Sequence, residues 1–458
     1  MDRARQTARR TRVVAVPVLA VVSMLSGCVV QIQRASVADV THAVPAAETR
    51  PEIPKRDLPW PDRFGDRDNQ RGVIVPLEGP LSIWQGVWLG EHHAWRSRKV
   101  EYDDAAALGK AFGAPSGFDF RTEGPGSFLF VRDRRYSEPD PPPVPEFTDA
   151  DPAEMFKFVS AKVTRTWGGV PGVELQRTWF GLYDPSENLK GDRTQRGTIV
   201  LMPGMFGTPE PVIESLIKSM RDRGWSVLRM LSHPSRFTER LEVHVDADPS
   251  GAARIFAEEL TDRAAECAYA ASAAVQHAHT LRPELADKPT VLLGMSGGAI
   301  ALPTVFAYDP DAYDASVLIA GGVNFLGINL ASNYASFIDA VHAQWGDLDD
   351  PRDPTQDEQR ALAMAYLEHA ALDGHHLAEA LTSKPTLIIH GSSDRAVPAV
   401  FGDQLWERAG KPERWVFPVG HELVFLALPT QAGRMHRWLV ENLELEHNAG
   451  EDDDEVGP

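Results

Sequence analysis

Gly294-Met295-Ser296-Gly297-Gly298 decides the fold class of this chain. These residues follow a β-branched and apolar run at 289–293 and precede a helix-forming run at 299–307. A buried strand, a Gly-x-Ser-x-Gly turn and a helix in this order predict a sharp turn with the serine at its tip. The glycines permit a strained backbone and keep Cβ atoms out of a crowded space. We therefore expect the Ser296 hydroxyl at the edge of a sheet.

Two later segments offer the groups that a serine nucleophile needs. Asp394 follows an apolar run at 386–389, and His421 follows a third short strand pattern at 414–418. An imidazole can take the serine proton as general base, and a carboxylate can fix its tautomer and stabilise the imidazolium. The sequence therefore predicts a catalytic triad of Ser296, Asp394 and His421.

Each of the three residues also has a purely structural interpretation. A Gly-x-Ser-x-Gly match is weak on its own. Asp394 lies in a turn-like Asp-Arg-Ala-Val-Pro context and could simply hydrogen-bond that turn. His421 could be no more than the first residue of a helix. The triad is favoured because the three residues follow predicted strands, and because no rival carboxylate follows the strand pattern at 315–320.

The turn after the strand pattern at 197–202 has the sequence Pro203-Gly-Met-Phe-Gly207. In a fold of this kind, one oxyanion-hole N–H comes from such a turn and the other from the residue after the nucleophile. We expect the backbone N–H groups of Met205 and Gly297 to be these donors. Loss of one such donor typically costs ~10²–10³ in rate.

In these four motifs and their order, residues 163–445 resemble the α/β-hydrolase family. The resemblance implies an α/β fold with a mostly parallel sheet flanked by helices, and catalysis without a cofactor or metal. The chain departs from the family at Pro203-Gly204, where many relatives have His-Gly. The departure keeps the backbone donor but removes a side chain that often packs under the oxyanion hole.

Relatives in this family commonly carry a cap over the substrate pocket after the strand that follows the nucleophile. Residues 323–382 occupy this place and have a helical pattern, so we expect a helical cap insertion there. A surface insertion that never touches substrate is the alternative. Candidate pocket residues are Phe206, Met295, Phe325 and Leu326.

The predicted activity is hydrolysis of an ester, thioester or amide through an acyl-enzyme intermediate. An ester is favoured because alcohols leave more easily than amines. An acyltransferase and a serine peptidase would use the same triad, so both stay open. An envelope lipoprotein that binds rather than cuts is a third class, disfavoured because all three triad residues are present.

The first 27 residues have the features of a signal peptide. Five arginines precede an apolar run of 13 residues at 13–25, which is too short to span a bilayer. The run ends in Leu25-Ser-Gly-Cys28, which resembles a bacterial lipobox. We therefore expect acylation of Cys28, which would anchor the protein in a membrane of the bacterial cell envelope. An ordinary signal peptide with an incidental cysteine and an uncleaved anchor are the alternatives.

The remaining segments differ in composition. We expect a flexible tether at 28–70, a β-rich accessory segment at 71–137, a proline-rich linker at 138–150, the hydrolase domain at 151–446 and an acidic disordered tail at 447–458. Strand patterns at 72–76, 83–89 and 127–131 make the accessory segment either a small domain or extra strands on the hydrolase.

The formal net charge of the chain is −19. Loss of residues 1–27 removes a net +4 and leaves −23. This charge argues against nucleic-acid partners and against electrostatic binding to anionic lipid. The second of the two cysteines, Cys267, lies in an alanine-rich helical stretch and is expected to be a buried, free thiol. Paired histidines such as His92-His93 and His375-His376 lack acidic or thiol partners at ligand spacing, so no metal site is expected.

Overall fold

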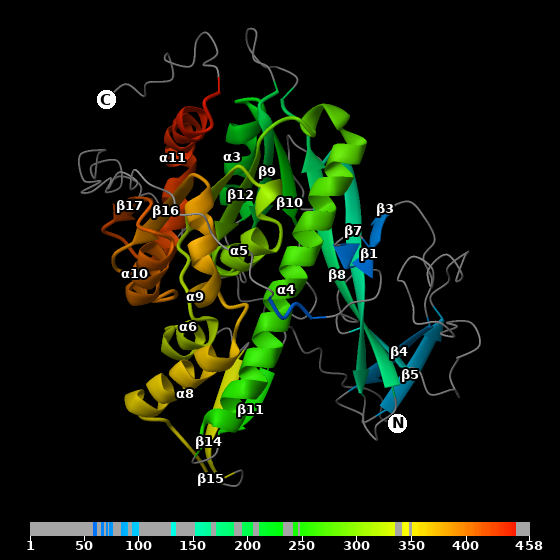
Figure 1. Ribbon diagram of the computed structural model, residues 1–458, viewed down its shortest axis with the longest axis vertical. Coiled ribbons are helices and arrows are strands. Elements are labelled where there is room, and N and C mark those ends of the chain that lie inside the picture. Colours follow the sequence, from blue (N-terminus) through cyan, green and yellow to red (C-terminus); the bar gives the residue numbers. More distant parts are fainter. Residues whose placement is uncertain are drawn as a thin grey trace, which may run out of the picture. The chain divides into compact units, whose positions relative to one another are not determined.

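The computed structural model (Figure 1) describes most of the predicted hydrolase domain and short stretches before it. The described residues are 58–61, 66–67, 70–71, 73–76, 84–89, 94–99, 130–133, 152–165, 171–186, 195–204, 210–231, 241–245, 248–334, 341–347 and 350–445. The predicted signal peptide with Cys28, the proline-rich linker and the acidic tail lie outside these residues, as do Met205 and Phe206.

A ten-stranded sheet forms the centre of the fold, in the order β17-β16-β13-β12-β9-β10-β8-β7-β3, with β6 paired to β8. Its strands are β3 (Val73–Pro76), β6 (Phe130–Asp133), β7 (Glu154–Arg165), β8 (Pro171–Tyr183), β9 (Gly197–Met202), β10 (Trp225–Met230), β12 (Thr290–Met295), β13 (Ala315–Ile319), β16 (Thr386–Gly391) and β17 (Glu413–Phe417). The strands from β17 to β10 are parallel, whereas β8 is antiparallel to β10 and β7.

The chain reverses direction across this sheet at β9. From β9 it moves to β10 on one side, and it then returns to β12 on the other side. In open parallel sheets, functional residues gather at the carboxyl ends of the strands beside such a reversal. The strand order confirms the predicted α/β-hydrolase fold class.

Helices cover both faces of the sheet, and the central strands are therefore buried on both sides. The helices of the body are α3 (Glu210–Arg221), α4 (Ser250–Leu281), α5 (Gly297–Tyr308), α10 (Ala399–Arg408) and α11 (His421–Asn442), with short 3-10 turns η4 (Pro283–Leu285) and η5 (Pro310–Ala312). Leu201 and Leu293 pack with α3 and α11, whereas Val200 and Leu292 pack with α4 and α5. No helix in these described stretches is long and apolar enough to cross a bilayer.

The insertion between β13 and β16 contains helices, as predicted, and also a β-hairpin that was not predicted. Its elements are α6 (Phe325–Ala331), β14 (Val341–Asp347), β15 (Asp350–Arg352), α8 (Gln356–His369), α9 (Gly374–Leu377) and η6 (Ala378–Ser383). β14 pairs with β15 and also with β11 (Leu241–Val245), which lies outside the insertion. This long-range partner explains why a helical pattern alone missed the strands.

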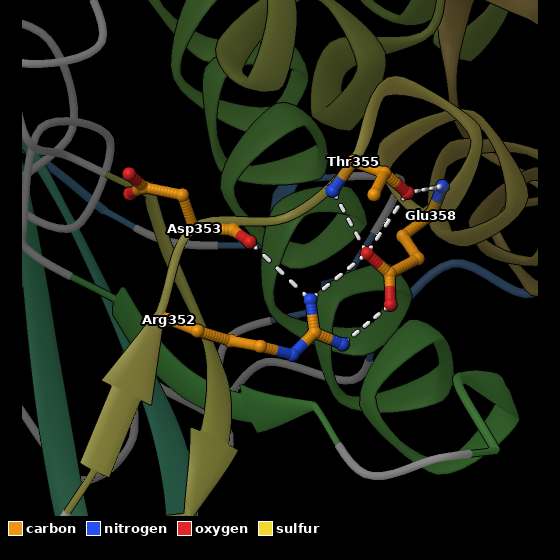
Figure 2. Close-up of polar contacts among 4 residues, drawn as sticks. All are labelled: Arg352, Asp353, Thr355 and Glu358. Atoms are coloured by element: carbon orange, nitrogen blue, oxygen red, sulfur yellow. Dashed lines mark hydrogen bonds and ion pairs between the residues drawn. The ribbon is translucent and has the colours of Figure 1, made fainter.

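Helix α8 begins with a reciprocal cap that Figure 2 shows. The Glu358 N–H donates to Thr355 Oγ1 at 3.2 Å, and the Thr355 N–H donates to Glu358 Oε2 at 2.8 Å. Arg352 Nη1 donates to the same carboxylate at 3.0 Å. The Arg352 guanidinium, together with the hydrogen bonds from Thr355, lowers the pKa of Glu358 to about 2. The cap thus ties the end of β15 to the start of α8.

Strands appear in all three places where the accessory segment was predicted to have them. β3 and β6 join the main sheet, which favours the interpretation as extra strands on the hydrolase. β4 (Trp84–Leu89) instead pairs with β5 (Ala94–Lys99), and β1 (Asp66–Arg67) pairs with β2 (Gln70–Arg71).

Leu58, Trp60 and Pro61, which lie in the predicted tether, contact the main body of the fold. The Trp60 ring lies 4.9 Å from that of Tyr308 and 6.1 Å from that of Tyr269, between centroids. The Tyr269 hydroxyl donates to Pro61 O at 2.7 Å, and Leu58 packs on the same core. The prediction of a flexible tether as far as residue 70 is therefore wrong for 58–61. The proline-rich composition of this segment does not indicate that Trp60 packs against the rings of Tyr269 and Tyr308.

Candidate active site

A sharp turn at Ser296 connects β12 to α5. β12 ends at Met295 and α5 begins at Gly297, so Ser296 alone makes the turn, with φ 50° and ψ −114°. A residue other than glycine in such a sparsely populated region costs about 1–3 kcal/mol. The Ser296 N–H donates to Ile319 O at 2.8 Å, and Ser296 O accepts from the Ile300 N–H at 2.9 Å. These backbone bonds hold the strained residue.

The glycines of the motif are required by contacts with backbone atoms. A Cβ at Gly294 would lie 2.7 Å from Gly298 O, and a Cβ at Gly298 would lie 2.3 Å from Met202 O. The Gly298 N–H donates to Pro203 O at 3.1 Å. The start of the turn after β9 is thereby fixed beside the start of α5.

The structure brings Ser296, Asp394 and His421 together in one hydrogen-bonded chain. Ser296 Oγ lies 3.0 Å from His421 Nε2, and His421 Nδ1 lies 2.7 Å from Asp394 Oδ2. Asp394 follows the end of β16, and His421 is the first residue of α11. An ionised carboxylate only accepts, so Nδ1 carries the imidazole hydrogen and Nε2 can accept the serine hydrogen.

The Asp394 carboxylate uses its two oxygens for different tasks. Oδ2 faces His421, whereas Oδ1 accepts from the N–H groups of Ala396 at 2.9 Å and Val397 at 2.8 Å. The side chains of Asp394 and His421 are 0% and 8% exposed. One Asp394 oxygen therefore bonds its own turn while the other bonds the imidazole of His421.

Gly297 lies where an oxyanion donor is expected. As the first residue of α5, it has no intrahelical acceptor for its N–H, and a helix N-terminus favours negative charge. Met205, the other predicted donor, lies outside the described residues. Its place in an oxyanion hole stays a prediction.

The predicted pocket residues are packed in the core wherever the structure describes them. Met295 is fully buried among side chains of α3 and α11, on one face of the sheet. Leu326 is fully buried and Phe325 is 4% exposed in the cluster on the other face. We therefore assign Met295 and Leu326 to the core, because no surface of either is open to a ligand. Phe206 lies outside the described residues.

A buried histidine beside the triad was not predicted. His390, the next-to-last residue of β16, is fully buried, and burial lowers its pKa to about 4. Its ring fills the space above Gly402 of α10, where a Cβ would lie 2.4 Å from His390 Cε1. Neither ring nitrogen has a hydrogen-bond partner in the described part of the chain. The only signal in the sequence is its position four residues before Asp394.

A buried carboxylate at the base of the insertion was also missed. Asp373 accepts from the N–H groups of Asn324 at 2.9 Å, Phe325 at 2.8 Å and His375 at 2.7 Å, and from the Tyr366 hydroxyl at 2.8 Å. These bonds connect the turn after β13 with α8 and α9. The Asp-Gly start of α9 could have suggested a helix cap, but not the distant partners.

Among the described residues, no group of three or more His, Cys, Asp or Glu side chains is placed to hold a metal ion. Cys267 is buried and free, as predicted, and burial raises the pKa of its thiol.

Comparisons with family models and with curated proteins gave no match. Similar solved structures include Est1E from Butyrivibrio proteoclasticus, with 13% identity, a TM-score of 0.37 and coverage of 61% of this chain and 99% of that chain. An esterase of Pyrococcus furiosus, Pf2001, has 12% identity, a TM-score of 0.37 and coverage of 62% and 93%. A puromycin-hydrolyzing peptidase of Mycobacterium tuberculosis has 15% identity, a TM-score of 0.38 and coverage of 63% and 40%.

Proposed function

We propose that this chain is a serine hydrolase that cleaves a carboxylic ester through an acyl-enzyme intermediate. The observation that carries the proposal is the chain of contacts from Ser296 Oγ through His421 to Asp394, at 3.0 Å and 2.7 Å. A serine in a strained turn, a buried imidazole and a carboxylate at these distances meet the geometric requirements for an activated nucleophile.

In the acylation step, Ser296 Oγ attacks the ester carbonyl carbon while His421 Nε2 takes its proton. Asp394 stabilises the imidazolium, and the Gly297 N–H donates to the oxyanion. The tetrahedral intermediate then expels the alkoxide, which takes the proton from His421 and leaves as an alcohol. The acyl group stays on Oγ as an ester.

In the deacylation step, His421 Nε2 takes a proton from water, whose oxygen attacks the acyl carbon. Collapse of the second tetrahedral intermediate breaks the bond to Oγ, and the serine recovers its proton from His421. The products are a carboxylic acid and free enzyme. An ester is preferred to an amide because an alkoxide is a better leaving group than an amine.

Turnover of p-nitrophenyl esters of increasing acyl length tests this proposal. We expect turnover by the wild type and by Ser250→Ala, which alters an exposed serine at the start of α4, but not by Ser296→Ala. Equal turnover by Ser296→Ala and wild type would overturn it. Added alcohol that captures most of the acyl group would identify an acyltransferase, and turnover of peptide anilides alone would identify a peptidase.

We further propose, from the Leu25-Ser-Gly-Cys28 sequence, that acylated Cys28 holds the enzyme on the extracytoplasmic side of a bacterial membrane. Metabolic labelling with an alkyne fatty acid tests this location. Label on the wild type and none on Cys28→Ala is expected, and an unlabelled wild type that leaves the membrane in high salt would contradict it.

A further inference from the structure

A short segment of the insertion crosses between the two turns that carry Asp394 and His421. The segment is Ser332–Tyr334, directly after α6, and we call it the strap. The Asn333 N–H donates to Arg395 O at 3.0 Å, next to Asp394. The Tyr334 hydroxyl donates to Glu422 Oε1, next to His421. One three-residue segment thus bonds both turns from outside.

The Tyr334 ring also contacts the catalytic imidazole itself. Its centroid lies 6.0 Å from that of His421, with an interplanar angle of 84°. Phe425 makes a second edge contact with the imidazole, at 4.9 Å and 84°. Both distances lie in the range of attractive edge-to-face pairs. The His421 imidazole is therefore held by Asp394 on one nitrogen and by two aromatic rings.

The strap has its own internal support. The Tyr334 N–H donates to Ser332 Oγ at 3.0 Å, and Ser332 N–H donates to Ile328 O at 2.8 Å. Tyr334 is half-buried and Glu422 is exposed. The side chain reaches the site from a supported backbone without being part of the core, so its substitution leaves the core packing intact.

We propose that Tyr334 is a positioning residue for His421 and that the strap couples the insertion to the triad. This inference rests on the proposed hydrolase function. During the reaction the imidazole passes a proton between Ser296, the leaving group and water while it keeps its bond to Asp394. A ring against the imidazole limits its swing, and the bonds to Arg395 and Glu422 fix the two turns relative to each other.

The test compares Tyr334→Ala, Tyr334→Phe and a matched control, Tyr308→Ala, on a p-nitrophenyl ester. Tyr308 is also half-buried, and it contacts the rings of Trp60 and Tyr269 rather than the triad. We expect Tyr334→Ala to lower kcat about tenfold with little change in KM, because a small misplacement of a catalytic group is costly. Tyr334→Phe keeps the ring and should recover most of kcat.

A rise in KM alone, or a loss of kcat no larger in Tyr334→Ala than in Tyr308→Ala, would overturn the proposal. The variants are compared only where thermal unfolding shows a wild-type-like transition. If Tyr334→Ala does not fold, Glu422→Ala releases the hydroxyl while leaving the ring in place. It is then expected to lower kcat about threefold without raising KM, since an exposed hydrogen bond contributes little. An unchanged kcat in that variant would overturn the proposal.

A spectroscopic readout separates failure of this proposal from failure of the proposed function. The His421 Nδ1 proton, bonded to Asp394, should give a low-field proton resonance in the full chain, whether or not any ester is turned over. We expect Tyr334→Ala to broaden that resonance by faster exchange with water, and Tyr308→Ala to leave it unchanged. Equal line widths in the wild type and Tyr334→Ala would contradict a positioning role.

Discussion

The turn at Ser296 and the insertion between β13 and β16 are held in place by different means. The turn is held by backbone atoms. There is no room for a Cβ at Gly294 or Gly298, and backbone hydrogen bonds fix Ser296. In the insertion, side chains reach over long sequence separations, as Asp373 does to Asn324 and Tyr334 to Glu422.

Because of this difference, we expect substitutions at the turn and in the insertion to have effects of different size. The backbone hydrogen bonds and the close contacts at Gly294 and Gly298 leave the backbone of Ser296 little freedom. The insertion is held by the pairing of β14 with β11, by buried side chains such as Leu326 and Leu362, and by polar side-chain contacts that single substitutions can remove. We therefore expect substitutions at the turn and the triad to have large effects on activity or stability, and those in the insertion to have smaller ones.

The largest expected effect is that of Asp394→Asn on activity. The amide presents a wrong hydrogen-bonding pattern to His421, and loss of the correct tautomer in such a triad lowers kcat by about 10⁴-fold. Ester hydrolysis measures this loss. Asp403→Asn is the control, because its carboxylate is exposed and pairs with Arg414. A loss below tenfold in Asp394→Asn would contradict the assigned role.

Gly298→Ala tests the turn by its backbone contacts. A Cβ 2.3 Å from Met202 O forces β9 and α5 apart, which should cost about 3 kcal/mol in the free energy of unfolding. Urea denaturation measures it. Gly251→Ala is the control, because a Cβ there meets nothing within 4 Å. Equal midpoints for the two variants would show that the turn is not constrained as described.

Asp373→Asn tests the support of the insertion. The amide NH₂ would face a backbone N–H or the Tyr366 hydroxyl, and leaving such a buried donor unsatisfied costs roughly 2 kcal/mol. Tyr366→Phe removes only one of the four donors and should cost less. Hydrogen exchange of α8 and α9 gives a local readout. Unchanged exchange in Asp373→Asn would show that the insertion is held elsewhere.

Burial of His390 is expected to make the free energy of unfolding depend on pH. Its pKa is about 4 in the folded chain, below the ordinary value of 6.5, so the unfolded chain binds the proton first as pH falls. Its contribution to stability is therefore lost as pH falls from about 6.5 to about 4. The difference in Tm between the wild type and His390→Asn should shrink over this range. A difference that stays constant would contradict this assignment, and His369→Asn, at an exposed position, is the control.

Glu358 is expected to make the local stability of the insertion at α8 depend on pH, with a smaller effect. Its pKa of about 2 lies below the ordinary value of 4.5, so its stabilising effect is present above pH 4.5 and is lost as pH falls toward 2. We expect the protection factors at the start of α8, which compare exchange with that of an unstructured peptide at the same pH, to fall over that interval in the wild type and to stay constant in Glu358→Gln. Glu368→Gln, exposed on the same helix, should behave as the wild type. The same pH response in Glu358→Gln and the wild type would contradict the cap.

Local sequence patterns sufficed for the parts of the site that local structure decides. Ser296, Asp394 and His421 each follow a strand of the parallel part of the sheet, and the carboxyl ends of neighbouring parallel strands meet at one edge of a sheet. The short apolar run of each strand and the glycines around Ser296 indicate these positions directly.

Contacts between distant segments could not be predicted in the same way. β14 pairs with β11, whose partner residues lie a hundred positions earlier, and Tyr334 contacts Glu422 across 88 residues. An apolar residue beside the serine gives no sign of which sheet face it occupies, so Met295 was assigned to a pocket although it packs under α3 and α11. The contacts of Trp60 with Tyr269 and Tyr308 could not be predicted either, because they join a proline-rich segment to distant helices.

Mass spectrometry of the fluorophosphonate adduct tests the central claim most directly. The reagent reacts with a serine only when a base activates it, so the adduct maps the nucleophile without assuming a substrate. We predict one adduct per chain, on Ser296, formed by the wild type and absent from His421→Ala. An adduct on another serine, or none on a chain with a wild-type unfolding transition, would contradict the account.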